Sequence, residues 1–167
     1  MTPTRYRIVP ADPHAHVFEV TCIVSDPDPC GQAFRLPAWI PGSYLIREFA
    51  RHFVKVRAES DGAAVAVRKM AKDVWQVPAC TGPLAFIAEV YAFDLSVRAA
   101  YLDQTRGYFN GPAVFVWPVG RADRPCEVEI VAPAGDAYCN WRVATSFSAR
   151  APKLTISARI SRRATTS

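Results

Sequence analysis

The chain lacks the residue patterns that mark most self-contained enzymes. Only three histidines occur, His14, His16 and His52, and there is no H-E-x-x-H pair, which excludes a zinc-peptidase centre of that kind. His14 and His16 would share one face of a strand and could supply two metal ligands, but two exposed histidines near the start are the favoured interpretation. There is no G-x-S-x-G motif and no glycine-rich phosphate loop, and a cysteine or serine nucleophile would find few bases within reach.

Long apolar runs and paired cysteines are also missing. No stretch approaches the roughly 18–20 apolar residues of a membrane helix, and the first residues show no apolar core of a secretory signal, so we expect no membrane partner. The five cysteines are odd in number and form no C-x-x-C pair. This pattern favours reduced, buried thiols over a disulfide framework or a zinc ribbon, and it indicates a cytoplasmic location.

Acidic residues are absent from the end of the chain, and this absence produces the net charge. The whole sequence has 20 basic and 15 acidic residues and a net charge of +5. Six basic residues follow position 136, so residues 1–136 carry 14 basic and 15 acidic side chains and are nearly neutral. A nucleic-acid interface would spread lysine and arginine over the folded body, with aromatic residues between them. We therefore predict no nucleic-acid partner.

Alternating and β-branched segments dominate what is present. Apolar residues recur at every second position, and Asp61-Gly62 between two such segments is the strongest hairpin signal. The expected fold is all-β, a β-sandwich or curved sheet of about ten strands with at most one or two short helical turns, one of them within 43–52. The predicted strands cover residues 6–9, 16–24, 32–39, 53–59, 64–67, 73–77, 84–93, 113–117, 127–131 and 141–145.

Residues 36–49 mix aromatic side chains, proline, glycine and paired charge in a way that no simple strand or helix needs. The favoured interpretation is structural, a core edge with a Pro41-Gly42 turn. The functional alternative places Tyr44 and Arg47 at a domain interface or on the wall of a cleft.

Residues 96–112 are dense in hydrogen-bonding side chains between two apolar strands. Such groups usually pair or face a ligand, because leaving a buried polar group unpaired costs about 1–3 kcal/mol. A loop that satisfies its own polar groups and a loop that binds a ligand are both open interpretations. The candidate contact residues here are Tyr101, Asp103, Arg106, Tyr108 and Asn110.

Together these motifs resemble the N-terminal domain of the glycyl aminopeptidase family, also called metallopeptidase family sixty-one. The matching stretches are residues 36–49, 97–111, 126–133 and 141–145, in the order of the family. The resemblance implies a saddle-like β-domain over residues 1–147, followed in the whole protein by a zinc-binding catalytic domain and a PDZ domain. This β-domain would hold no cofactor itself, and zinc would belong to the catalytic domain.

The resemblance also implies a role. The β-domain would pack on the catalytic domain, close one side of the substrate cleft and help to bind the free amino terminus of a peptide substrate. Residues 106–111 resemble the region that does this in related aminopeptidases, so Tyr108 and Asn110 are the leading contacts. No catalytic residue is implied here, so the chain alone is expected to be inactive, and an orphaned interface predicts a homodimer.

Two further interpretations remain open. The chain could be a free-standing β-sandwich module that binds peptide or carbohydrate, which would present tryptophan or tyrosine in a groove. Residues 148–167 are basic where the family continues with acidic residues, which predicts a poorly ordered tail that does not match the family and suggests a truncation with a foreign or frame-shifted end. Reading the encoding DNA in the other two frames past codon 147 tests that hypothesis.

Overall fold

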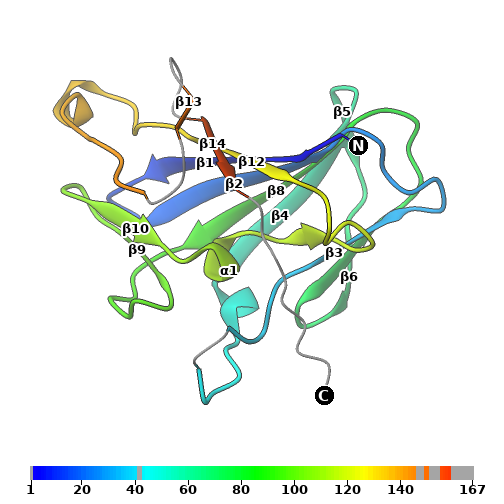
Figure 1. Ribbon diagram of the computed structural model, residues 1–167, viewed down its shortest axis with the longest axis horizontal. Helices are drawn as coiled ribbons and strands as arrows, with labels where there is room; N and C mark the ends of the chain where they lie inside the picture. Colours follow the sequence, from blue (N-terminus) through cyan, green and yellow to red (C-terminus); the bar gives the residue numbers. More distant parts are fainter. Residues whose placement is uncertain (1, 41–42, 146–148, 151–154, 159–167) are drawn as a thin grey trace.

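The protein is an all-β fold in the computed structural model, which describes residues 2–40, 43–145, 149–150 and 155–158. This confirms the predicted fold class (Figure 1). Within the described residues the strands are β1 (Thr4–Asp12), β2 (Val17–Val24), β3 (Gln32–Arg35), β4 (Phe53–Ser60), β5 (Ala63–Val65), β6 (Arg68–Ala71), β7 (Val74–Val77), β8 (Leu84–Tyr91), β9 (Ala100–Leu102), β10 (Gly107–Phe109), β11 (Trp117–Pro118), β12 (Cys126–Ile130), β13 (Ala149–Arg150) and β14 (Thr155–Ala158). The helical turns are η1 (Phe49–His52), α1 (Gly111–Val114) and η2 (Asp136–Tyr138).

The largest sheet has the strand order β13-β14-β12-β1-β2-β8-β4-β5. Neighbouring strands in it are antiparallel, except that β1 and β12 run parallel with Thr4 opposite Cys126. The hairpin between β4 and β5 turns at Asp61-Gly62, as predicted. Both residues have positive φ, 49° and 79°, which matches the twist of the flanking strands.

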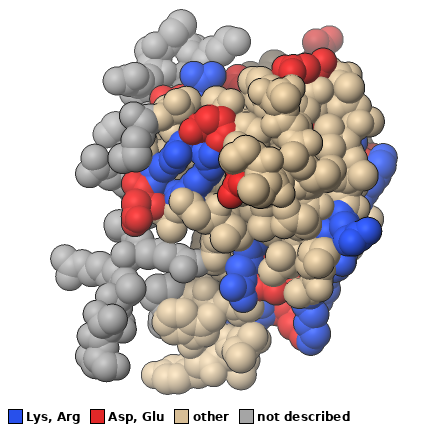
Figure 2. All heavy atoms as spheres, turned by 90° about the vertical axis from the view of Figure 1, so that its right-hand side faces the viewer, with Lys and Arg blue, Asp and Glu red and all other residues tan. Residues whose placement is uncertain are grey.

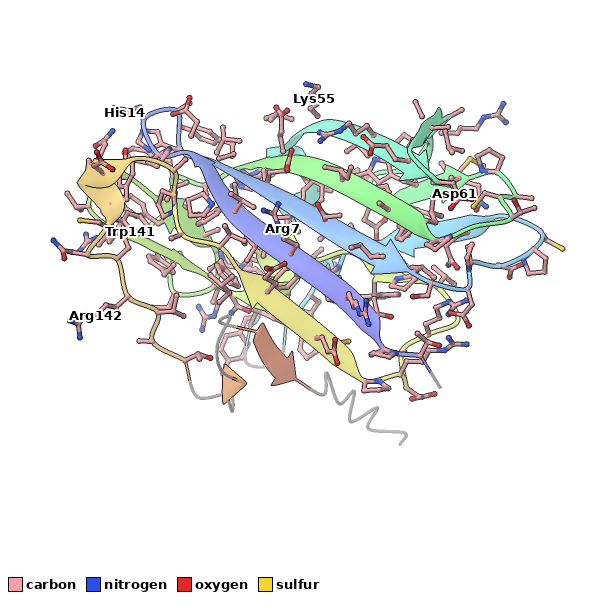
Figure 3. The ribbon with its side chains drawn as sticks, turned by 90° about the horizontal axis from the view of Figure 1, so that it is seen from above. Arg7, His14, Lys55, Asp61, Trp141 and Arg142 are labelled. Carbon is pink, nitrogen blue, oxygen red and sulfur yellow. The ribbon has the colours of Figure 1, made fainter. Side chains whose placement is uncertain are left out.

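The two faces of this sheet differ because its strands alternate. The inner face carries buried apolar residues, among them Ile8, Val20 and Phe86. The outer face, seen from above in Figure 3, carries charged side chains, with Arg7 near its middle. Ion pairs cross between strands there, at N–O distances from 3.0 to 3.6 Å: Arg5–Glu127, Arg7–Glu129, Lys55–Glu89 and Arg57–Glu19.

A second layer covers the inner face. Its four-stranded sheet has the order β11-β3-β7-β6, and the Phe34 ring on β3 stacks on the Phe86 ring of the large sheet with centroids 4.6 Å apart. Trp75 of β7 is buried against the same ring, at 5.8 Å. Strands β9 and β10 form a separate antiparallel pair. An isolated bridge between Phe93 and Tyr101 links this pair to the segment that follows β8. The result is a sandwich around one core.

Several predicted elements are wrong in detail. Residues 113–117, predicted as a strand, form α1 and the start of the short β11. Residues 113–116 are buried and Trp117 is half-buried, and a short buried apolar run does not distinguish strand from helix. Residues 141–145 form no strand and are mostly exposed. The strands β6, β9 and β10 were not predicted, because β6 is entirely exposed and the other two have only three residues each.

Other expectations concern the cysteines and the end of the chain. Cys22 and Cys126 are buried and Cys80 is half-buried, but Cys30 and Cys139 are exposed, so the prediction of buried thiols is wrong for these two. Most of the predicted tail 148–167 lies outside the described residues, which include only β13 and β14 from it. In the described part of the chain, no helix has the length and apolar character needed to cross a membrane.

Candidate functional site

The β9–β10 hairpin brings four of the predicted contact residues together. Tyr108 lies opposite Tyr101 in the strand register, and their rings stack with centroids 6.1 Å apart. The Tyr101 ring also stacks on Phe93 at 5.2 Å, and the Arg106 guanidinium lies 5.7 Å from its centroid. The fourth residue is Asp103, in the turn. The hairpin is therefore held by its own aromatic faces.

Asp103 organises the turn of this hairpin. Its Oδ1 accepts hydrogen bonds from the Thr105 N–H and hydroxyl, both at 2.7 Å, and from the Arg106 N–H at 2.9 Å. Its Oδ2 accepts the Tyr101 hydroxyl at 2.9 Å. The Thr105 bonds above all hold the pKa of the Asp103 carboxyl well below its usual range, and the same carboxylate raises the pKa of Tyr101. Asp103 therefore serves the loop itself.

Tyr108 fastens the hairpin to the 93–99 loop. Its hydroxyl lies 2.9 Å from the Asp94 carbonyl oxygen and 3.0 Å from that of Ser96, so its proton is shared between two backbone acceptors. Partial burial raises the pKa of Tyr108. Asn110 follows the hairpin and its N–H donates to the Ala99 carbonyl, but its side chain does not cap α1.

Tyr44 and Arg47 lie in a different segment, the 43–48 loop before η1. Tyr44 is fully exposed, and Leu45 and Ile46 are 65% and 78% exposed. Two internal hydrogen bonds fix the conformation of the loop. The Trp39 indole donates to the Ser43 carbonyl at 2.8 Å, and the Ser43 hydroxyl donates to the Leu45 carbonyl at 3.0 Å. In this conformation the side chains of Tyr44, Leu45 and Ile46 face solvent.

The 93–99 loop also exposes apolar side chains. Leu95 is 65% exposed and Val97 is 80% exposed. In Figure 1 the 43–48 loop projects at the bottom of the molecule and the 93–99 loop at its lower left. In the view of Figure 2, the lowest described part of the molecule shows no Lys, Arg, Asp or Glu. We call the exposed side chains of Tyr44, Leu45, Ile46, Leu95 and Val97 the apolar end.

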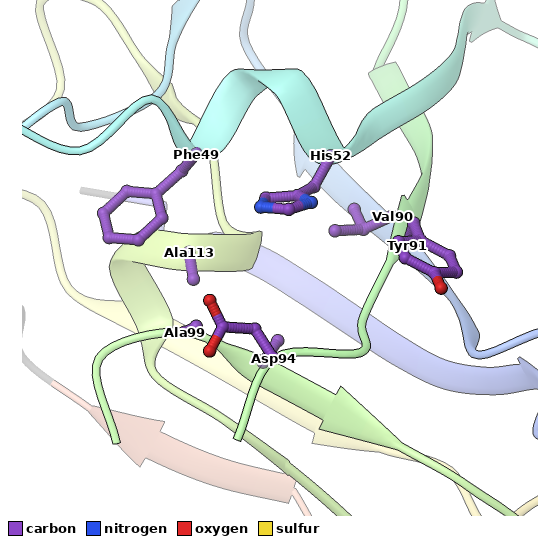
Figure 4. Close-up of a pocket in the computed structure, with 8 residues that line it drawn as sticks. Phe49, His52, Val90, Tyr91, Asp94, Ala99 and Ala113 are labelled. Carbon is purple, nitrogen blue, oxygen red and sulfur yellow. The ribbon is translucent and has the colours of Figure 1, made fainter. Parts of the chain in front are cut away.

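A small pocket separates the two loops, and sequence reasoning missed it. It is lined by Phe49, His52, Val90, Tyr91, Asp94, Ala99, Ala100 and Ala113 (Figure 4). Figure 4 shows the Asp94 carboxylate pointing into it from the side opposite η1. Burial and then Arg51 lower the pKa of His52, with Asp94 acting weakly in the other direction. His52 lies at the end of the helical turn predicted within 43–52, which was the one available signal.

No metal site emerges from these side chains. Among the described residues, no three histidine, cysteine, aspartate or glutamate side chains are grouped so that they could hold an ion. His14 and His16, which the sequence offered as two possible metal ligands, contact different residues. His14 Nδ1 lies 3.1 Å from the Gln104 amide nitrogen, and His16 Nδ1 lies 2.6 Å from the Leu102 carbonyl oxygen.

Comparison with known proteins decides the family. Residues 5–159 match the family described as Peptidase M61 N-terminal domain. The chain belongs to this family. The resemblance predicted from residues 36–49 and 97–111 is thereby confirmed.

Solved structures contain related folds. This M61 N-terminal domain is similar to part of an aminopeptidase N family protein from Idiomarina loihiensis, with 37% identity and a TM-score of 0.88 over 93% of this chain and 27% of that chain. A variant of an M1 zinc metallopeptidase from Deinococcus radiodurans matches with 15% identity and a TM-score of 0.48, over 95% of this chain and 38% of that one. The domain thus spans about a quarter of the Idiomarina protein. Among curated proteins, none matches the chain.

Proposed function

We propose that this chain is the non-catalytic N-terminal domain of a zinc-dependent, glycyl aminopeptidase-like metallopeptidase. In this role it packs on the catalytic domain and forms one wall of the cleft that takes a peptide substrate. Membership of the family supports the proposal, as does the 27% share of the Idiomarina loihiensis protein that the chain covers. Cytoplasmic location, and the absence of nucleic-acid and membrane partners, stay predictions.

The observation that carries this proposal is the apolar end. Three consecutive apolar side chains, Tyr44 to Ile46, face outward, and Leu95 and Val97 face outward on the neighbouring loop. Contiguous exposed apolar groups cost solubility and mark surfaces that another protein segment covers. Among the described residues, the outer face of the large sheet carries ion pairs between neighbouring strands, and these already satisfy its charged side chains.

Zinc has its place in the catalytic domain under this proposal. Under the proposal, zinc and the reacting groups belong to that domain. Its own contribution is positional: Tyr44 and Arg47 contact the catalytic domain, and Asn110 and Arg106 remain the candidates for contact with substrate. Asp103, Tyr101 and Tyr108 act indirectly, by holding the hairpin.

A free-standing peptide or carbohydrate module receives less support. Such a module presents tryptophan or tyrosine in a groove, whereas the exposed Trp39 and Tyr44 belong to a projecting loop. Tyr91 does line the small pocket, but the other walls of that pocket include three alanines. The apolar end also predicts self-association of the isolated chain. Sedimentation velocity at high concentration should show a dimer, and a clean monomer would count against this.

The first experiment is an activity assay. The pure chain, with or without added zinc, should not hydrolyse glycyl-anilide substrates. Measurable hydrolysis by this chain would overturn the proposal of a non-catalytic domain.

The second experiment tests docking. In a chimera, residues 5–145 of this chain replace the matching domain of the Idiomarina loihiensis protein. We expect one cooperative thermal transition, because docked domains unfold together, and two transitions after Ile46→Asp. Val54→Asp, at another exposed apolar position, on β4, is the matched control. Two independent transitions in the unchanged chimera would contradict packing.

A further inference from the structure

Arg47 has a polar atom that the described part of the molecule does not satisfy. Its Nε is buried and has no hydrogen-bond acceptor among the described residues. Its backbone is fixed, because the Arg47 N–H donates to the Ala38 carbonyl at 2.6 Å. A buried donor without an acceptor costs about as much as a lost hydrogen bond, and more when the group is charged. Arg47 as a whole is only half-buried, so part of the residue is open to a group from outside.

The neighbouring charges are already engaged elsewhere. The Glu48 carboxylate accepts from Lys72 at 2.7 Å. Asp94, across the pocket, accepts from the Ser96 N–H at 2.8 Å through Oδ1. Arg51 donates from Nε to His52 Nε2 at 3.1 Å. The carboxylate beside Arg47 in sequence is therefore paired with Lys72, and the exposed apolar side chains of Tyr44, Leu45 and Ile46 directly precede Arg47 in the loop.

We infer that the apolar end receives a segment with a carboxylate among apolar side chains, and that this carboxylate accepts hydrogen bonds from the Arg47 guanidinium. The inference rests on the proposed function, because the segment is assigned to the catalytic domain. Charge complementarity selects this chemistry. A guanidinium pairs with a carboxylate through two parallel N–H···O bonds, which an amide or hydroxyl cannot match. Apolar neighbours strengthen the pair by excluding water.

Two dyes that differ in one charged group test this on the chain as it stands. Anilinonaphthalene sulfonate carries an anion on an aromatic ring system, and N-phenyl-1-naphthylamine has the same rings without the sulfonate. We expect both to bind the apolar end, with the sulfonate dye bound more tightly. Arg47→Met should weaken the sulfonate dye about tenfold, the loss of one charge-assisted contact, and change the neutral dye by less than about twofold.

Matched variants locate the effect. Ile46→Ser should weaken both dyes, Val54→Ser neither, and Arg51→Met should leave the preference for the sulfonate dye unchanged. In the unaltered chain, added salt should reduce that preference, which keeps the test valid if Arg47→Met does not fold. No binding of either dye, an Arg47-independent or salt-independent preference, or equal loss in Val54→Ser would overturn the inference. A chimera that unfolds in two transitions would instead contradict the proposed function, whatever the dyes do.

Discussion

The β9–β10 hairpin and the 43–48 loop use their side chains in opposite ways. In the hairpin, Asp103 and Tyr108 direct their polar atoms to acceptors and donors of the same loop region. In the 43–48 loop, the internal hydrogen bonds of Ser43 and Trp39 shape a turn whose apolar side chains face solvent. The polar groups of the hairpin are thus engaged within the domain, whereas the apolar side chains of the 43–48 loop are exposed in the described part of the chain.

The sharpest way to break this contrast is to remove the hairpin's organiser. Asp103→Ala deletes four hydrogen bonds to one carboxylate, so we expect it to lower the free energy of unfolding by about 2 kcal/mol. Urea denaturation followed by tryptophan fluorescence measures this. Asp123→Ala, at an exposed position in another loop, is the control. An equal loss in both variants would show that Asp103 has no special role.

Acid should weaken the hairpin in the same manner. Because hydrogen bonds lower the pKa of Asp103 in the folded state, its contribution to stability is complete above the unfolded value near 3.9 and is lost as the pH falls below it. Asp26, whose pKa is lowered by Arg124 and Arg121, adds to the same loss. Asp103→Asn should therefore make the unfolding free energy depend less steeply on pH below about 4. An unchanged slope would contradict this.

A comparison of two tyrosine variants should show a smaller effect on the free energy of unfolding. Tyr108→Phe removes a hydroxyl bonded to the 93–99 loop and should cost about 1 kcal/mol. Tyr44→Phe removes a hydroxyl from a fully exposed side chain and should cost nothing measurable. Thermal unfolding of the two variants side by side gives the difference. Equal shifts in the midpoint would remove the contrast between the loops.

The smallest effect on stability is expected at the apolar end. Ile46→Ser should change the free energy of unfolding of the isolated chain by less than about 0.5 kcal/mol, because the side chain is 78% exposed. It should reduce self-association instead, which sedimentation velocity detects. A loss of stability comparable to that of Asp103→Ala would place Ile46 in the core.

The sequence predicted the large sheet well and the site less well. The strand β4 alternates apolar and charged residues, and β2 alternates buried and half-buried residues, a pattern that follows directly from one buried face. The exposure of Leu45 and Ile46 could not be read in this way, since apolar residues ordinarily indicate a core. Nor could the sequence show that Asp103 bonds to its own turn, because that depends on where the backbone places Thr105 and Arg106.

The pairing of β1 with β12 has a consequence for how the chain is made. β1 can find β2 as soon as both have left the ribosome, but its other edge waits for Cys126 and the strand that follows it. Until then the first strand presents open backbone groups, the kind of edge that recruits other chains. Parallel pairing over so long a separation is intrinsically slow. During synthesis β12 therefore completes the pairing of β1, and a ribosome that stalls before Cys126 leaves that edge of β1 unpaired.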